Sequence, residues 1–512
     1  LLRTRYAAMA FAPPPADQRE LWQKELQQLR DKKEDAEAEL ARASKKNSLT
    51  PSLEPQSAEI LTALPSGTVF VDFLRYEKCD PKSKQFAAGG ETHYVAFVLR
   101  SGTGVQRVEL GAAKTIELEV DTWRAALQSG DDAKLRTAND ALWNALLKPL
   151  APQLRGGGAL VVSLDGALNR LPLAALRPPG SDAYLIESRA IAVVPSARQV
   201  VELFSANRAN IIPPSFLAVG GVEYPGQTEP IENAPAPAPI FAAALKNLSP
   251  LPGTLLETEQ AAAVYRRSFA KENVVLLAGK DASERRVATE LAKKPRFVHL
   301  ATHGFFAPAM MRSALKDNRS ATTLAEESRG VSPWLLSGLV LAPESNAADM
   351  PADGVLTAEE LNALDLSGID LVVLSACETG LGDVAGGEGV LGLQRGFHVA
   401  GVRTVVTSLW KVDDAATSLL MQAFYENLWT KKLPKLEAMR QAQLSLLKTP
   451  TALQKRRDLL VQQFAQRGIT LEDAPAKPLP ASSESDRTHP RYWAAFILSG
   501  DAFNTAAPGA TP

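Results

Sequence analysis

Short apolar runs alternate with amphipathic stretches through the second half of the chain. Strand-like runs, bounded by glycine or polar residues, occupy 273–279, 296–303, 337–342, 369–377 and 402–410. Helical spacing separates them over 256–269, after Asp281, after Thr357, over 390–400 and over 413–428, and Asp281 and Thr357 each precede a glutamate by three residues, as in a capping box. Strands separated by helices of this length indicate βαβ crossovers, so we predict an α/β fold whose mostly parallel sheet is covered on both faces.

The first half shows a different order of elements. Residues 17–46 are rich in Glu, Gln, Lys and Ala with spaced leucines, which predicts a solvated N-terminal helix. Strand patterns follow at 68–74, 93–100 and 104–110, then a helix that includes 141–150 and a buried type of strand at 159–166. The proline-rich stretch at 211–253 interrupts this order, and 491–500 supplies a closing strand.

Composition excludes several classes of function. The chain has 512 residues with 45% hydrophobic content, enough for two or three domains, and its 56 basic residues nearly cancel its 57 acidic ones, so no nucleic acid partner is indicated. No apolar run approaches the roughly 18 residues of a spanning helix, so no membrane is expected. The two cysteines form no disulfide framework and no zinc spacing; we therefore expect no metal, no cofactor and a cytoplasmic protein, although the start at Leu1 suggests a fragment.

Two of the predicted strands end in reactive side chains, His303 and Cys377. The carboxyl ends of parallel strands meet at one edge of a sheet, so an imidazole and a thiol would lie on the same rim. A thiol needs a nearby base to become a nucleophile, and His303 supplies one. The backbone amides of Gly304 and Cys377 are suited to hold the oxyanion of a tetrahedral intermediate.

Each of these residues alone would more often be structural, because cysteine is among the most buried residue types. Their joint placement before a glycine-rich loop favours catalysis. His299 shares a strand face with His303, but no third ligand accompanies them, so we predict a supporting role rather than a metal. His398 and Cys79 are predicted to be structural.

The motifs that carry this chemistry also carry a family resemblance. They strongly resemble the CHAT domain, a member of the caspase and separase superfamily of cysteine peptidases. The matching segments are His299-Leu-Ala-Thr-His303-Gly304, Leu374-Ser-Ala-Cys377-Glu-Thr-Gly380, Gly386-Gly387-Glu388-Gly389, Ser408-Leu-Trp410-Lys-Val-Asp413-Asp414, Tyr492-Trp-Ala-Ala-Phe-Ile-Leu-Ser-Gly500 and, upstream, Ser163-Leu-Asp165-Gly166.

The resemblance implies a caspase-like three-layer sandwich with two caspase-like halves, the first inactive. It implies a His/Cys dyad in which His303 is general base and acid and Cys377 forms an acyl-enzyme. We predict a helical N-terminal segment at 1–60, the inactive half at 61–216, a proline-rich linker at 217–253 and the active half at 254–505. Proteins of this family commonly carry tetratricopeptide repeats before the domain, and the helix at 17–46 could end such a region.

A rival interpretation comes from Gly387-Glu-Gly389-Val-Leu-Gly392, which matches the dinucleotide fingerprint. A Rossmann turn places its first glycine at the strand end, whereas Cys377 to Gly386 intervene here. We favour a loop that, with Glu388, shapes the wall of a peptide-binding cleft.

Asp413 and Asp414 precede a helix, and capping could be their only role. The alternative is that one of them, most favourably Asp414, binds a basic residue before the scissile bond, because separase-like enzymes carry an acidic residue in a similar context. We therefore expect a cysteine endopeptidase acting on a protein substrate, regulated by a partner or an upstream repeat module. The competing hypothesis is a catalytically silent scaffold that binds peptides in the same cleft.

Overall fold

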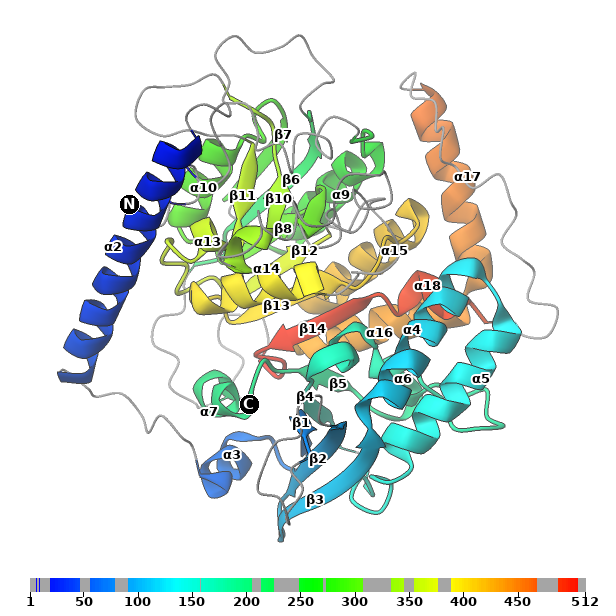
Figure 1. The fold of residues 1–512 in the computed structure, drawn as a ribbon. Coiled ribbons are helices and arrows are strands. Elements are labelled where there is room, and N and C mark those ends of the chain that lie inside the picture. The colour runs from blue at the N-terminus through cyan, green and yellow to red at the C-terminus, as the bar shows by residue number, and fades with distance from the viewer. Residues whose placement is uncertain are drawn as a thin grey trace. The chain divides into compact units, whose positions relative to one another are not determined.

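The computed structural model describes residues 6, 9, 19–46, 56–78, 91–156, 158–204, 213–224, 248–269, 273–306, 333–344, 354–375, 388–466 and 487–504. They form two compact units, one from Leu1–Leu53 and Ile212–Lys411 and the other from Glu54–Ile211 and Val412–Pro512 (Figure 1). Cys79 and Cys377 lie outside the described residues, as do most of 217–253 and all of 307–332. The predicted domain boundaries follow the family resemblance rather than compactness, and they stay a prediction.

The first unit is built on a parallel sheet. Its strands lie in the order β7-β6-β8-β12-β13, and every neighbouring pair is parallel. The bounds are β6 Phe216–Val222, β7 Val274–Gly279, β8 Phe297–Leu300, β12 Leu371–Leu374 and β13 Thr404–Ser408, with helices α2 Arg19–Lys46, α9 Pro252–Ser268, α10 Glu284–Ala292, α13 Ala358–Leu361 and α14 Glu388–Val399. These elements confirm the predicted α/β pattern.

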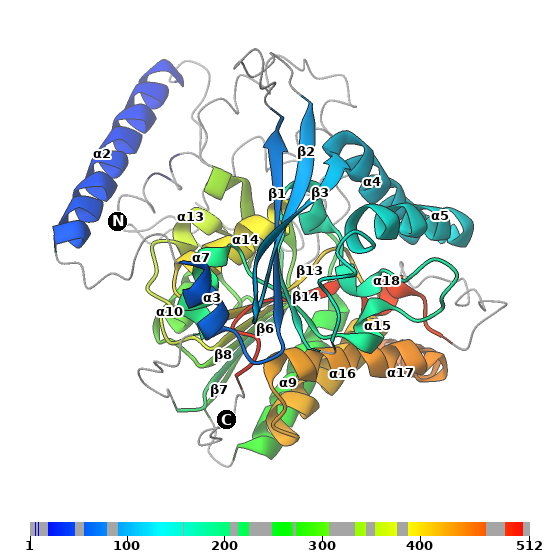
Figure 2. The same cartoon turned by 90° about the horizontal axis from the view of Figure 1, so that it is seen from below.

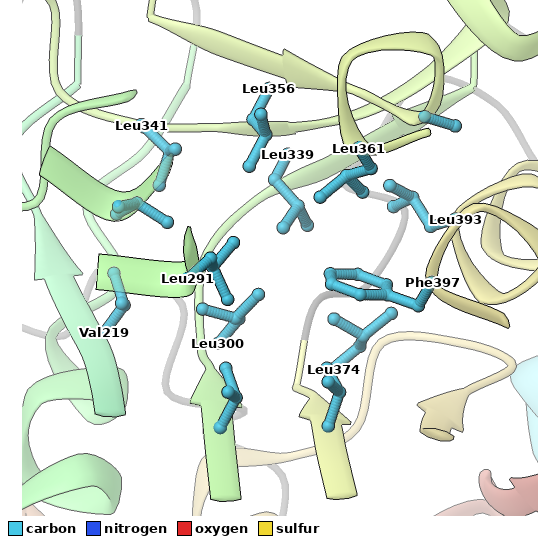
Figure 3. Packing of buried hydrophobic residues seen from close by; sticks show 14 of the residues in the cluster. Val219, Leu291, Leu300, Leu339, Leu341, Leu356, Leu361, Leu374, Leu393 and Phe397 are labelled. Atoms are coloured by element: carbon cyan, nitrogen blue, oxygen red, sulfur yellow. The ribbon is translucent and has the colours of Figure 1, made fainter. Parts of the chain in front are cut away.

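Helices cover both faces of this sheet because its strands are apolar on both sides. On one face Val298 and Leu300 of β8 belong to a buried cluster with Leu291 of α10 and Phe397 of α14 (Figure 3). On the other face α9 packs, with Tyr265 stacked on Phe216 at a ring distance of 5.5 Å. The continuous hydrophobic runs of the sequence therefore reflect burial on two sides.

The run at 337–342 is a strand, but its placement in the parallel sheet was wrong. It forms β10 Ser337–Val340, which pairs antiparallel with β9 Gly304–Phe306 and β11 Val355–Thr357 in a separate three-stranded sheet. A short 3-10 helix, η5 Pro333–Leu336, precedes it. Apolar content alone cannot distinguish a strand of one sheet from a strand of another.

Helix α2 packs on the first unit through both apolar and charged contacts. Leu26 and Leu29 lie against the buried cluster, whereas Leu21 is 63% exposed. Lys33 Nζ lies 2.9 Å from Glu359 Oε1 on α13, where the carboxylate side chain is only 2% exposed. The predicted N-terminal helix is thus anchored by a largely buried ion pair.

The second unit contains a mixed sheet in the order β3-β2-β1-β4-β5-β14. Strands β1 to β3 pair antiparallel, while β1, β4, β5 and β14 pair parallel. Figure 2 shows the long strands β1 to β3 in blue, with α4 and α5 lying side by side. The strands are β1 Val69–Glu77, β2 Thr92–Arg100, β3 Thr103–Ala112, β4 Leu160–Ser163, β5 Ile191–Val193 and β14 Phe496–Gly500.

The helices of the second unit include two π-helical turns, at Trp143–Leu147 and Glu426–Thr430, and two 3-10 turns, at Gly166–Arg170 and Leu173–Ala175. The α-helices are α3 Ser57–Ala63, α4 Ala113–Ser129, α5 Asp132–Leu142, α6 Leu185–Ser188, α7 Ala197–Phe204, α15 Asp414–Tyr425, α16 Lys435–Lys448, α17 Pro450–Gln466 and α18 Pro490–Trp493.

The helix caps test the predicted helix starts. Thr357 and Glu360 form the capping box predicted for α13. The cap predicted at Asp281 was wrong, because Ser283 is the N-cap of α10 and accepts from Arg286 N. Asp and Ser are both strong cap residues, so a cluster of them leaves the helix start undetermined by two residues.

Helix α14 packs closely on β10 because position 392 lacks a side chain. A Cβ added at Gly392 would lie 2.3 Å from Ser337 Oγ and 3.0 Å from its Cβ, which no packed pair tolerates. This close approach explains the glycine without a bound ligand.

We expect Gly392→Ala to lower the free energy of unfolding by about 1–3 kcal/mol through overpacking. Urea unfolding followed by circular dichroism measures it. Gly104→Ala is the control, since an added Cβ there meets nothing within 4 Å. Equal effects of both substitutions would contradict the packing account.

Candidate functional site

The order of the first sheet defines where a site can form. The chain passes from β6 to β7 on one side and then to β8 on the other side of β6. Connections that leave in opposite directions open a crevice at the carboxyl ends of such strands. Tyr224 follows β6 and His303 follows β8, so both lie at this switch point.

His303 is held by a backbone carbonyl. The strand ends at Leu300, and the next three residues carry the chain to an imidazole that is 2% exposed. Its Nε2 lies 2.8 Å from Ser249 O, and a carbonyl oxygen only accepts, so Nε2 carries the proton. Nδ1 is then the basic nitrogen of a neutral ring, and it has no hydrogen-bond partner among the described residues.

A buried aromatic ring fixes the plane of the imidazole. The ring centroids of Tyr224 and His303 are 4.6 Å apart. The Tyr224 hydroxyl lies 3.1 Å from Thr302 Oγ1, which donates to Val340 O at 2.5 Å, and Val340 N donates to His303 O at 2.8 Å. Side chain and backbone around position 303 are therefore fixed from three directions.

The electrostatics of the site favour an uncharged imidazole. Burial lowers the pKa of His303 to about 4, the hydrogen bond with Ser249 opposes this shift, and Lys411 adds to it. Burial also raises the pKa of Tyr224 to about 12. At neutral pH the ring is a base and the phenol is a neutral donor.

The other predicted residues of this site are only partly described. Cys377 lies outside the described residues, two positions after Ser375, where the described part of that strand end stops. Gly304 opens β9, opposite Leu339 of β10. Glu388 begins α14, and its side chain is outside the described part. The predicted dyad and oxyanion roles stay predictions.

Asp413 and Asp414 belong to the second unit and differ in their contacts. Asp413 is the N-cap of α15: its Oδ1 accepts from Ala415 N and Ala416 N, both at 3.1 Å. Its Oδ2 also lies 3.0 Å from Arg457 NH2 on α17. Asp414 is exposed in the first turn of the helix. The capping role is thus confirmed for Asp413, whose carboxylate is engaged internally.

Sequence reasoning missed three residues near His303. Ser249 acts through its backbone carbonyl, which no motif reveals. Tyr224 follows a strand that the proline-rich composition of 211–253 obscured. Glu257 is a 5% exposed carboxylate on α9, and a charged residue among the apolar positions of a predicted helix is the one signal that could have found it.

The glycine-rich fingerprint does not fit a dinucleotide site. Strand β12 ends at Leu374 and α14 begins only at Glu388, so the helix does not start at the strand end. Gly392 packs against Ser337 instead. A Rossmann turn needs the helix N-terminus directly after the strand to meet the pyrophosphate.

Within the described ranges, no three His, Cys, Asp or Glu side chains gather in a way that could hold a metal ion. None of the helices found there combines the length and the apolar character needed to cross a membrane.

These features define an α/β protein, consistent with a caspase-like fold, whose candidate site lies at the carboxyl edge of a parallel sheet. The family model of the CHAT domain matches residues 136–501. The chain belongs to the CHAT domain family.

Two curated relatives carry the name Tetratricopeptide repeat protein 28. The human and the mouse protein are each 26% identical to this chain over 303 residues, or 56% of the chain. The aligned region is 11% of the human and 12% of the mouse protein, so the chain spans only a small part of these relatives.

Among solved structures, the Arg specific cysteine proteinase gingipain R is similar with a TM-score of 0.35 and 9% sequence identity, covering 77% of this chain and 75% of that chain. A similarity of this extent supports no assignment of activity or specificity.

The buried histidines predict a pH-dependent stability. Burial lowers the pKa of His398 to about 4, as it does for His303, and both imidazoles titrate near pH 6.5 once unfolded. Between about pH 6.5 and 4 the unfolded chain binds protons at these histidines that the folded chain does not bind. The contribution of the neutral histidines to the free energy of unfolding is therefore fully present above pH 6.5 and decreases as the pH falls below it. Each histidine contributes a loss of about 3 kcal/mol at most.

We expect His398→Gln to remove the His398 share of this loss, measured as the difference in unfolding free energy between pH 7.5 and pH 5. A pH dependence identical to that of the wild type would show that His398 is not the titrating group.

Proposed function

We propose that this chain is a cysteine endopeptidase in which His303 and Cys377 form the catalytic dyad. The observation that carries the proposal is the orientation of His303, whose Nε2 is held by Ser249 O while Nδ1 has no partner among the described residues. Membership of the CHAT domain family, which resembles the caspase and separase peptidases, supports the same chemistry.

Burial keeps the His303 imidazole neutral at pH 7, which is the protonation state that a general base needs before it accepts a proton. An imidazole that is neutral at pH 7 can take a proton from a neighbouring thiol at Nδ1, while Nε2 stays fixed on the carbonyl. The Ser249 carbonyl then orients the imidazole of His303, as a third side chain does in catalytic triads. This accounts for a dyad with no obligatory third residue.

In the proposed reaction, Cys377 Sγ attacks the scissile carbonyl carbon and its proton passes to His303 Nδ1. The C–N bond breaks as that proton is delivered to the leaving amine, which gives a thioester. Water then attacks the thioester and loses a proton to Nδ1; the C–S bond breaks, the carboxylic acid product leaves, and the proton on Nδ1 returns to Sγ to regenerate the thiol. The amides of Gly304 and Cys377 are proposed to hold the oxyanion.

The proposal extends to specificity and regulation. Asp414 is the proposed contact for a basic residue before the scissile bond, because the carboxylate of Asp413 already caps α15 and pairs with Arg457. Glu388 is proposed to line the cleft. An upstream helical-repeat region, as the names of the curated relatives suggest, or a partner protein is proposed to regulate activity.

An acyloxymethyl ketone peptide ending in arginine should alkylate Cys377. We expect His303→Ala to slow labelling by roughly 10²–10⁴-fold, as for loss of a general base. Because His303 is neutral well below pH 7, the labelling rate should show no histidine-dependent fall between pH 7 and 5.5. Intact-mass spectrometry of protein sampled over time measures the rate.

Cys377→Ala is the control and should show no labelling. Wild-type protein that stays unlabelled under every activating condition would favour the peptide-binding scaffold over the enzyme. Proteome-wide mapping of cleavage sites, comparing wild type with Cys377→Ala, then identifies substrates.

The two aspartates provide a matched pair for specificity. Asp414→Asn should abolish the preference for an arginine probe over a leucine probe, a change of roughly 10-fold to 100-fold for a lost charged hydrogen bond. Asp413→Asn keeps a good N-cap residue and should leave the preference intact. Loss of preference in Asp413→Asn alone would reverse the assignment.

A further inference from the structure

A buried carboxylate joins the two strand ends that lead to the proposed dyad. Glu257 of α9 is 5% exposed, and its Oε2 accepts from Ser375 Oγ at 3.2 Å. Its Oε1 lies 3.1 Å from His299 Nε2, an ion-pair distance without hydrogen-bond alignment. His299 is 0% exposed, and Ser375 is 9% exposed.

These contacts occur where the backbone ladder of the sheet ends. Ser375 N donates to Leu300 O at 2.9 Å, which is the last described bond between β12 and β8. On its other side β8 continues its ladder with β6, since Ala301 N donates to Val219 O at 2.8 Å. At this last pair of ladder positions Glu257 adds a side-chain connection between the two strands, to Ser375 on one side and to His299 on the other.

The start of α9 also holds His303. Ser249, whose carbonyl accepts from His303 Nε2, lies just before the helix. The helix start is itself pressed against β6: Thr254 Oγ1 accepts from Gly221 N at 2.9 Å, and a Cβ at Gly220 would lie 2.5 Å from Thr254 O. The first turns of α9 and the residue just before the helix therefore contact both chain segments that lead to the proposed catalytic residues.

A purely stabilising role does not account for this network. Taking a carboxylate and an imidazole out of water costs free energy, and apolar side chains of similar volume stabilise a core at least as well. What the polar groups add is a defined geometry, because Glu257 Oε2 accepts from Ser375 Oγ while Oε1 lies beside His299 of the neighbouring strand.

We infer that Glu257 is a positioning residue which, through Ser375 and His299, sets the separation of the segments that carry His303 and Cys377. The inference rests on the proposed function. Glu257 is proposed to act on the distance between base and nucleophile, to which proton transfer is sensitive within about 1 Å, rather than on the reacting atoms themselves.

The test uses the full chain with Cys79→Ser, so that Cys377 is the sole thiol of the two in the sequence. The rate constant for alkylation by the arginine acyloxymethyl ketone is measured from pH 5 to 9, below the melting temperature of every variant. We expect Ser375→Ala and Glu257→Gln to lower the plateau rate roughly tenfold or more. Ser375→Thr, which keeps the hydroxyl, should recover part of it.

Glu290→Gln is the matched control. Glu290 is 4% exposed, but it pairs with Arg286 and Lys293, which lie on or directly after its own helix α10. We expect its rate to stay within twofold of the background protein, whatever its effect on melting temperature.

The outcomes separate the two proposals. Normal rates in Ser375→Ala and Glu257→Gln, with or without a lower melting temperature, overturn the positioning role and leave the peptidase intact. No labelling of the background protein under any activating condition overturns the peptidase, and the positioning role with it. If Glu257→Gln does not fold, Ser375→Ala and its threonine counterpart decide the question.

Discussion

Buried polar groups at the carboxyl ends of β6 and β8 must find their partners inside the protein, and this requirement organises the first unit. The imidazole of His303, the hydroxyls of Tyr224 and Thr302 and the carboxylate of Glu257 are all removed from water. Each contacts a group from a different element, so strand ends, the start of α9 and β10 are fixed relative to one another. Breaking one of these hydrogen bonds would leave a further buried group unsatisfied, at a cost of about 1–3 kcal/mol.

The same requirement explains why the site is built from backbone as much as from side chains. The Ser249 carbonyl selects the tautomer of His303, and the Val340 amide and carbonyl hold the residues around it. Backbone groups are rigid once the helix and strands that carry them have formed. The neutral, oriented imidazole is therefore a product of the fold rather than of a side-chain triad.

Much of the fold follows from residue patterns, because burial leaves a periodic trace. Apolar runs such as Leu371–Leu374 mark strands buried on two faces, and the Thr357 and Glu360 pair marks a helix start. The switch point does not follow from periodicity, since strand order depends on contacts between distant segments, as the misplaced β10 illustrates. His303 could be predicted from its motif, whereas Ser249 contributes only a carbonyl, a group that every residue possesses.

The aspartate pair shows the same limit on the scale of single residues. From the sequence, Asp413 and Asp414 are nearly equally good candidates for the N-cap of α15. Only the structure distinguishes them, because Asp413 contacts two backbone amides of the helix and Arg457. Charge complementarity between α15 and α17 is invisible in a linear pattern, because 44 positions separate the partners.

The ion pair between Lys33 and Glu359 has a practical consequence for the boundaries of any shortened protein. A chain cut after α2 would leave the Glu359 carboxylate, 2% exposed on α13, without its ammonium partner. The same cut would uncover the part of the apolar cluster against which Leu26 and Leu29 pack. The N-terminal helix is therefore an integral part of the surface layer of this unit. A minimal domain defined by the family match alone would lack this helix and would expose part of the hydrophobic core.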